Sequence, residues 1–488
     1  MTTTTQSNPA TLFEVAAGRH TLTQLGNAER FFDLYGNDVL YCPKIKQWYV
    51  WDGSRWAPDE MLVVRSYMTK TVRTILQEAQ NPENSDRRNA LLLFAMASET
   101  NPNICGALEH AKILVPIKHE ALDQDIWLLN FANGTLDLQS DGFRECRRED
   151  RLTKSVPYDY DDFLLRGCPQ WEQFLKEIFP PPYEEIIPFI QRAVGYSLTG
   201  NTDEHCLFLL HGVGANGKSV FIRTLQYVLG DYAAQSDWQS FAVKKGSGME
   251  IREDIARLAG ARFVSAVESA QHVRMAENVV KAITGGDKIT ARHLYKGSFE
   301  FIPQFKLWLA SNYLPKIVGQ DEGIWRRIML IPFTVTFKKT EQDKQLAQKL
   351  MSEAPGILNW ARKGLRDYLA QNGLNPPAAV LKATSEYRNE SDQLNHFLNA
   401  RTMASPTVSV RVDFLYPQYA QWTEATGETY TMPEREFNQA LESRGMEKKH
   451  TNKGNVWLGL DVITEESVER MAAKERTSAD AEMQETLF

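Results

Sequence analysis

The chain has 488 residues and a formal net charge of −7, and 43% of its residues are hydrophobic and 24% charged. This is an ordinary globular composition with room for roughly three domains. It excludes a membrane-spanning class, because no run approaches the roughly 20 apolar residues of a span, and the first residues lack the features of a secretory signal. Five scattered cysteines without a C-x-x-C pair argue against zinc and a disulfide framework, so we expect a reducing cytoplasm. The net negative charge does not indicate nucleic-acid binding, although positive charge can be confined to a channel.

The N-terminal part is predicted to be a mixed α+β domain over residues 21–168. It follows a stretch at 1–20 that is rich in Thr, Ser and Ala and that we predict to be disordered. In WYVWDGSRW, the alternating aromatic residues around Asp52 and Gly53 predict a β-hairpin.

Two helices and a second hairpin are expected in the rest of this domain. Helical periodicity extends over residues 61–80 and 89–99. The sequence LLNFANGTLDL then predicts a hairpin that turns at Asn133 and Gly134.

A strand–loop–helix unit follows at residues 206–230 and contains the pattern G-x-x-x-x-G-K-S. The apolar run before the loop predicts a buried parallel strand, and the run after it predicts a helix that ends at Gly230. Glycines in such a loop let backbone N–H groups converge on a phosphate chain, Lys218 can reach the β- and γ-phosphates, and the Ser219 hydroxyl can ligate Mg²⁺. The predicted nucleotide-binding residues are Gly212, Val213, Gly214, Ala215, Asn216, Gly217, Lys218, Ser219 and Val220.

Polar residues end two further apolar strands of the same region. Glu268 follows the strand predicted at 263–267, and Asn312 ends the strand predicted at 305–312. Ligands bind at the carboxyl ends of parallel strands, where Glu268 could orient the attacking water and support Mg²⁺, and Asn312 could bond the γ-phosphate. The alternative is a surface glutamate and a turn asparagine.

Positive charge is concentrated at two places after Glu268. Arg292, His293 and Lys296 lie in a predicted hairpin over residues 289–301, a form that suits contacts with a nucleic-acid backbone. Arg326 and Arg327 precede another apolar strand, where either could stabilise transition-state charge on a neighbouring subunit's nucleotide. Solvated charges and ordinary ion pairs are the structural alternatives.

The C-terminal part changes character again. Residues 340–462 show helical periodicity and then short strands, as in a helical and winged-helix-like domain. The end, 463–488, is charged and polar and predicts a solvated helix or a disordered tail.

Taken in order, these motifs resemble those of the superfamily 3 helicases, and within them the phage/plasmid and poxvirus primase–helicase family. The core residues that carry the resemblance are GVGANGKS, SAVES, KAITGGDKITARHLYK, WLASN and WRRI. The upstream segment GNAERFFDLYGNDVLYCPKIKQWYVWDGSRW resembles the pre-helicase domain, and TSEYRNESDQLNHFL resembles the C-terminal extension. The resemblance covers about residues 20–460.

The resemblance implies an AAA+-like P-loop core of three α/β/α layers over residues 169–339, assembled as a homo-hexamer around single-stranded DNA. ATP and Mg²⁺ would bind at subunit interfaces. One subunit would supply Lys218, Ser219, Glu268 and Asn312, the next would supply Arg326 or Arg327, and the hairpin would contact DNA through Lys296, His293 and Arg292. The direction implied is 3′ to 5′, and the C-terminal module would bind duplex DNA or a partner.

The residues before the core resemble the pre-helicase domain and not a polymerase, so we expect a helicase that lacks primase activity and works with a separate primase or polymerase. The substrates would be single-stranded and forked DNA of a phage, prophage or plasmid-like element. Two other functions stay open: a replication initiator or loader that ATP switches, and an ATPase that acts on protein. DNA-stimulated ATP turnover distinguishes the last of these from the others.

Overall fold

The structure is a computed structural model that describes residues 20–160, 167–243, 253–268, 273–292, 298–428, 430–452 and 454–463. The predicted disordered N-terminus and charged tail therefore lie almost wholly outside the described residues. The chain forms two compact units, Met1–Leu314 with Glu322–Thr384, and Pro315–Asp321 with Ser385–Phe488.

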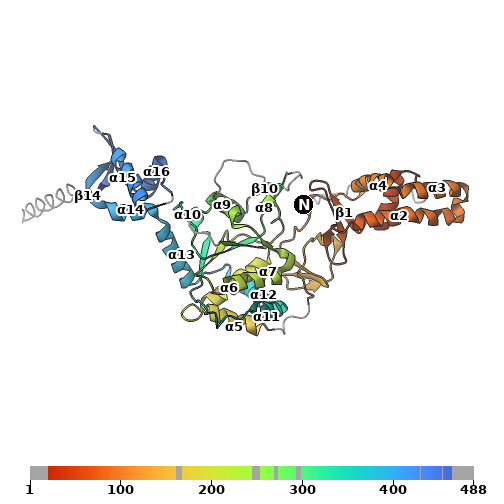
Figure 1. The fold of residues 1–488 in the computed structure, drawn as a ribbon, viewed down its shortest axis with the longest axis horizontal. Coiled ribbons are helices and arrows are strands. Elements are labelled where there is room, and N and C mark those ends of the chain that lie inside the picture. Colours follow the sequence, from red (N-terminus) through yellow and green to blue (C-terminus); the bar gives the residue numbers. More distant parts are fainter. Residues whose placement is uncertain are drawn as a thin grey trace, which may run out of the picture. The chain divides into compact units, whose positions relative to one another are not determined.

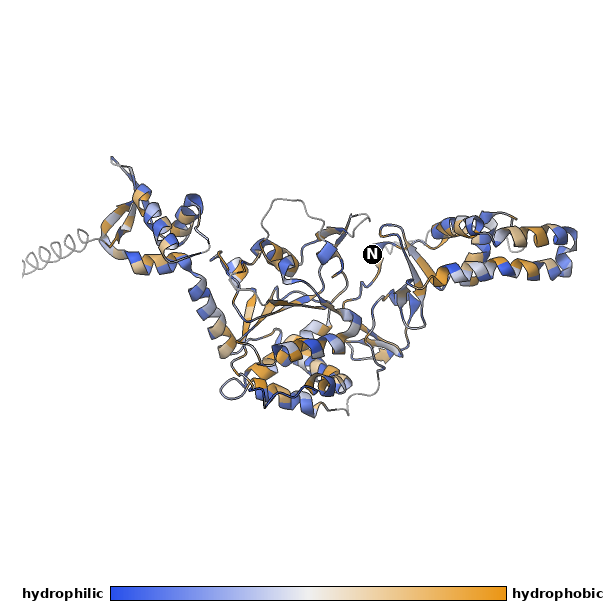
Figure 2. Ribbon diagram, viewed as in Figure 1, coloured by the Kyte–Doolittle hydropathy of each residue, from blue (hydrophilic) through white to orange (hydrophobic). Residues whose placement is uncertain are grey.

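A five-stranded, fully parallel sheet is the centre of the first unit, with the strand order β13-β7-β12-β9-β8. Its strands are among the apolar segments of the chain (Figure 2), as expected for a sheet covered on both faces. Stacked aromatic rings join three strands, since Trp308 lies 4.2 Å from Phe208 and 5.5 Å from Phe263 between ring centroids. The strands are β7 (Leu207–His211), β8 (Ala233–Gln235), β9 (Phe263–Glu268), β12 (Lys306–Ser311) and β13 (Ile328–Pro332).

Helices α5, α6, α11 and α12 gather on one side of this sheet (Figure 1). Helices α6 and α12 approach closely because each has a glycine at the crossing: a Cβ at Gly195 would lie 2.2 Å from the Leu365 nitrogen, and one at Gly364 would lie 1.9 Å from the Gln191 oxygen. The helices of the core are α5 (Pro169–Ile178), α6 (Ile186–Leu198), α7 (Lys218–Leu229), α8 (Glu253–Ala256), α9 (Glu277–Thr284), α10 (Glu322–Trp325), α11 (Leu346–Met351) and α12 (Ala354–Gln371).

The first compact unit extends further than the core that the sequence predicted. Helices α11 and α12 share its hydrophobic cluster, so the unit ends at Thr384 and not near residue 339. On the N-terminal side, Leu129, Phe131 and Leu136 belong to the same cluster, and the Asn130 backbone nitrogen donates to the Tyr232 hydroxyl at 3.1 Å. Apolar burial therefore joins the second hairpin to the core.

Both predicted N-terminal hairpins are present. Trp51 pairs with Trp56 in the first, and Phe131 pairs with Gly134 in the second, so that turn begins one residue earlier than expected. The predicted helices correspond to α2 and α3, and two more, α1 and α4, pack beside them. The elements are α1 (Gln24–Tyr35), β1 (Val39–Cys42), β2 (Gln47–Trp51), β3 (Trp56–Pro58), α2 (Val63–Gln80), α3 (Arg88–Ser98), α4 (Asn101–Leu114), β4 (Leu128–Phe131), β5 (Gly134–Asp137) and β6 (Phe143–Arg144).

The predicted basic hairpin is also present as two antiparallel strands, β10 (Ile289–Arg292) and β11 (Ser298–Phe301). Ala291 pairs with Phe299, and Arg292 pairs with Ser298. His293 and Lys296 lie outside the described residues.

The second unit holds a three-stranded sheet of order β14-β16-β15 with three helices against it. Helix α13 (Ala378–Ser391) begins in the first unit and ends in the second. The elements that follow are α14 (Gln393–Arg401), β14 (Thr402–Arg411), α15 (Val412–Ala425), α16 (Glu434–Ser443), β15 (Lys448–Thr451) and β16 (Gly454–Val462). Within the described ranges, no helix has the length and apolarity needed to cross a membrane.

Candidate nucleotide-binding site

The predicted phosphate loop joins the end of β7 to the start of α7, as its sequence required. Gly212 is fixed by space, because a Cβ there would lie 2.1 Å from the Phe333 carbonyl oxygen. Gly217 has φ +89° and immediately precedes α7, and Ala215 also adopts a positive φ of +59°. The residues between Gly212 and Ala215 face open space, since Val213 is 76% exposed and nothing lies within 4 Å of a Cβ at Gly214.

Lys218 is held inside the loop by three oxygens. Its ammonium donates to the Gly212 carbonyl, to Asn216 Oδ1 at 3.1 Å and to Asn312 Oδ1 at 3.1 Å. The side chain is only 5% exposed, and burial lowers the pKa of its amine to about 8. The loop therefore keeps a desolvated cation beside backbone groups that could receive a phosphate chain.

Asn216 links the loop to β13. Its Nδ2 donates to the Phe333 carbonyl at 3.4 Å while its Oδ1 accepts from Lys218, and the side chain is 3% exposed. The Phe333 nitrogen donates in turn to the His211 carbonyl at 2.7 Å. The loop thus depends on the residue after β13, which no loop pattern could have indicated.

The start of α7 offers groups suited to a triphosphate and a divalent cation. No side chain in the described part of the protein caps its first turn, so the N–H groups there are open to an anion. Ser219, in that turn, is exposed. These groups fit the phosphates and Mg²⁺ that the sequence implies: Ser219 would hold the ion, which would neutralise phosphate charge, whereas the side chain of Glu268, the other predicted ligand, lies outside the described part of the structure.

The carboxyl ends of three neighbouring strands lie at one level. Ser311 of β12 pairs with His211 of β7 on one side and with Glu268 of β9 on the other. Asn312, the next residue, reaches Lys218. The sheet therefore brings the backbones of the predicted site residues to one edge, as the strand-end argument expected.

His211 is a member of this edge that the sequence analysis overlooked. It is the last residue of β7, and burial first and the charge of Lys218 second lower the pKa of its imidazole, so it is neutral near pH 7. A histidine that ends an apolar strand beside a phosphate loop was the available signal.

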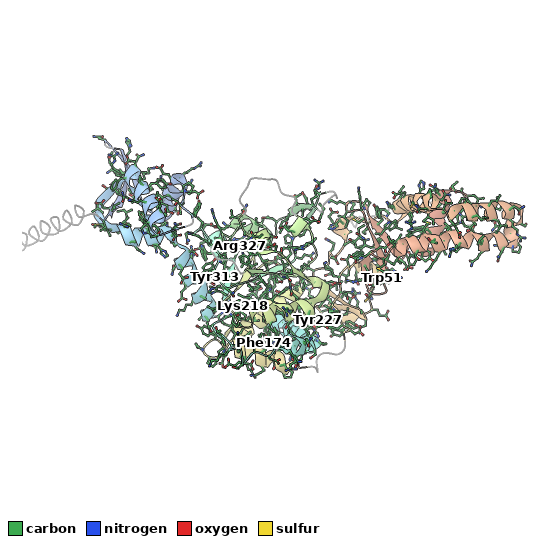
Figure 3. All side chains as sticks on the ribbon, viewed as in Figure 1. Trp51, Phe174, Lys218, Tyr227, Tyr313 and Arg327 are labelled. Atoms are coloured by element: carbon green, nitrogen blue, oxygen red, sulfur yellow. The ribbon has the colours of Figure 1, made fainter. Side chains whose placement is uncertain are left out.

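Arg326 and Arg327 lie at the other end of the sheet (Arg327 is labelled in Figure 3). The Arg327 carbonyl accepts from the Leu207 nitrogen at 2.7 Å, at the start of β7, so five residues of strand, or about 16 Å, separate it from Gly212. The Arg327 side chain is 9% exposed, and it donates to Thr284 Oγ1 at 3.1 Å and to the Gly323 carbonyl. Arg326 is exposed. Neither arginine shares an edge with the loop of its own chain.

Of the three predicted DNA-contacting residues of the hairpin, the structure describes only Arg292. Arg292 is exposed at the end of β10. Among the residues that the structure describes, no three His, Cys, Asp or Glu side chains form a group that could hold a metal ion.

The five-stranded parallel sheet with helices packed against it makes this a mixed α/β protein. Three protein-family models match the chain: "D5 N terminal like" at residues 28–180, a family of unknown function (DUF5906) at 210–327, and "Poxvirus D5 protein-like" at 389–465. The first and third of these models, together with relatives named as putative helicases or primases, support the D5-like primase–helicase family that the order of the motifs predicted.

Curated relatives carry helicase names. The chain is 28% identical to "Putative helicase L207/L206" of Acanthamoeba polyphaga mimivirus over 78% of this chain and 43% of that protein. It is 23% identical to "Putative helicase 022R" of Frog virus 3 (isolate Goorha) over 86% of this chain and 56% of that protein. The chain thus spans about half the length of these relatives. Among solved structures, the apo NrS-1 C-terminal region covers 92% of this chain and is itself covered completely, at 10% identity and a TM-score of 0.48.

Proposed function

We propose that this protein is an ATP-dependent DNA helicase of superfamily 3 that serves replication of a phage, prophage or plasmid-like element in the host cytoplasm. It would act on single-stranded and forked DNA as a homo-hexameric ring and move 3′ to 5′. One observation carries the proposal: Asn312, which follows β12, accepts a hydrogen bond at 3.1 Å from Lys218, the first residue of α7, beside an open phosphate loop, and the chain has relatives named as putative helicases.

An AAA+-like core of three layers is supported by the order of the strands. When the five strands are numbered along the chain, they lie in the sheet in the order 5-1-4-3-2. The phosphate loop follows strand 1, which is β7 and lies between β13 and β12. Lys218 would bind the β- and γ-phosphates, Ser219 and Glu268 would hold Mg²⁺, and Asn312 would bond the γ-phosphate or the attacking water. Glu268 would also orient that water.

Action in a ring is supported by the distance between the arginines and the loop. Because about 16 Å of strand separates them within one chain, an arginine could reach a γ-phosphate only on a neighbouring copy. We assign this role to Arg326, which is exposed, whereas Arg327 is buried and bonded to Thr284 and Gly323. The hairpin would contact DNA through Arg292, His293 and Lys296.

The second unit is proposed to be a winged-helix-like module for duplex DNA. Its elements run helix, strand, helix, helix, strand, strand, and its first strand pairs with its last. The exposed strand β15 carries Lys448, Lys449 and His450, which suits contacts with phosphates.

The test is ATP hydrolysis with and without single-stranded DNA, run beside unwinding of a 3′-tailed duplex by the same preparation. Turnover stimulated by DNA together with strand separation supports the helicase. Turnover indifferent to DNA contradicts it and favours an ATPase that acts on protein. Lys218→Ala should abolish turnover in either case and serves as the control for contaminating ATPases.

The alternative is an initiator or helicase loader that ATP switches. It predicts turnover and DNA binding without strand separation. We also propose that this chain has no primase activity and works with a separate primase or polymerase, since residues 28–180 match the D5 N-terminal-like model. Primers formed from labelled nucleotides by the purified chain would refute that proposal.

A further inference from the structure

The β10–β11 hairpin has one buried face and one exposed face. Ala291 and its cross-strand partner Phe299 are 2% and 1% exposed, whereas Thr290 and Arg292, which alternate with them, are exposed. The last described pair of the hairpin is Arg292 with Ser298, and the buried pair Ala291 with Phe299 comes directly before it.

The buried face belongs to a hydrophobic cluster that the N-terminal region shares with helix α8, which contributes Ala256. Ala291 and Phe299 share a hydrophobic cluster with Ile45, Tyr49 and Trp56 of the β1–β3 region. The ring of His119 packs on the ring of Phe299, with centroids 4.5 Å apart and planes inclined by 48°. The segment around His119, 180 residues before Phe299 in the sequence, thus packs on the predicted hairpin.

This support is itself fixed by backbone hydrogen bonds. The Tyr41 nitrogen donates to the Val115 carbonyl and the Ile117 nitrogen donates to the Tyr41 carbonyl, each at 2.8 Å, which ties the segment before His119 to β1. The Trp56 nitrogen donates to the Leu152 carbonyl at 2.8 Å. Moving the hairpin away from this segment would expose Phe299 to water.

We infer that Phe299 is a positioning residue that anchors the β10–β11 hairpin to the N-terminal region around His119, and with it the exposed Arg292 that we propose to contact DNA. The N-terminal region is then part of the machinery that couples ATP turnover to DNA. This inference rests on the proposed function, because it concerns how the hairpin of that function is held.

The test compares Phe299→Ala and Phe299→Leu with the unmodified full chain. We expect Phe299→Ala to raise amide hydrogen exchange at 289–292 and 298–301 by about tenfold, with α7 and β12 unchanged. Basal ATP turnover should stay within about twofold, while the single-stranded DNA concentration for half-maximal stimulation rises by about tenfold. Leucine, which keeps much of the apolar volume, should recover most of both losses.

His119→Ala provides a milder variant in case Phe299→Ala fails to fold. It should move both measurements in the same direction by about threefold, since aromatic contacts of this kind contribute modestly. The matched control is His110→Ala, a partly buried histidine of α4 in the same region and outside the hairpin cluster. It should leave both measurements unchanged.

Two results would overturn the inference: unchanged exchange in the hairpin strands of the Phe299 and His119 variants, or equal effects of His119→Ala and His110→Ala. If the unmodified chain shows no stimulation by DNA, the proposed function fails. The exchange experiment then still decides whether the N-terminal region around His119 anchors the hairpin.

Discussion

The buried position of Lys218 makes nucleotide binding depend on pH. The residue is 5% exposed, and burial lowers the pKa of its amine to about 8, whereas a triphosphate binds the charged form. Without nucleotide the amine is then roughly 90% charged at pH 7 and roughly 10% charged at pH 9. Since a bound phosphate favours the ammonium, binding above pH 8 must take up a proton.

The expected affinity for ATP therefore falls by about tenfold between pH 7 and pH 9, equivalent to about 1.4 kcal/mol. His211, the neighbouring titratable group at the strand end, does not interfere because its pKa is lowered and it stays neutral across this range. Calorimetry in buffers of different ionisation enthalpy measures both the dissociation constant and the proton uptake, which should approach one proton per ATP at pH 9.

Lys218→Met is the control for this experiment, because it removes the titrating amine and should leave weak binding that no longer varies with pH. An affinity of the unmodified protein that is constant from pH 7 to pH 9, or binding that releases protons, would refute the reasoning that Lys218 is buried and must be charged to bind.

The further predictions concern Asn312 at the strand end, the two neighbouring arginines, and the lysines of β15. Asn312→Ala should lower the ATP turnover rate by about 100-fold and change ATP affinity by less than about threefold, measured by steady-state kinetics beside direct binding; an equal loss of affinity would instead make Asn312 a binding group. Arg326→Ala should lower the ATP turnover rate by about 1000-fold without lowering the melting temperature. Mixing this variant with Lys218→Ala should restore part of the turnover, because some interfaces of a mixed ring contain both intact residues. Arg327→Ala should instead lower the melting temperature, because it removes a buried hydrogen bond to Thr284. Lys448→Glu with Lys449→Glu should weaken duplex binding by about tenfold and flatten its salt dependence, whereas unchanged binding would exclude β15 from the interface.

The local sequence was sufficient for the elements and for the edge of the sheet at which the candidate site lies. Apolar runs that end in Glu268 and Asn312 predicted strands whose ends meet the phosphate loop, because parallel strands bring their carboxyl ends to one edge. The glycine spacing predicted the loop for a similarly local reason: Gly212 and Gly217 satisfy requirements of backbone space and φ that neighbouring residues impose.

Only the tertiary structure could distinguish the exposed Arg326 from the buried Arg327, extend the first compact unit to Thr384, or pack Phe299 against His119. Each of these depends on which distant side chains exclude water from the residue concerned. Periodicity along a chain indicates which face of an element is buried, but not what buries it. The sequence by itself therefore determined the strands, the phosphate loop and the family resemblance, whereas packing between segments far apart in the chain decided which arginine is exposed and what supports the hairpin.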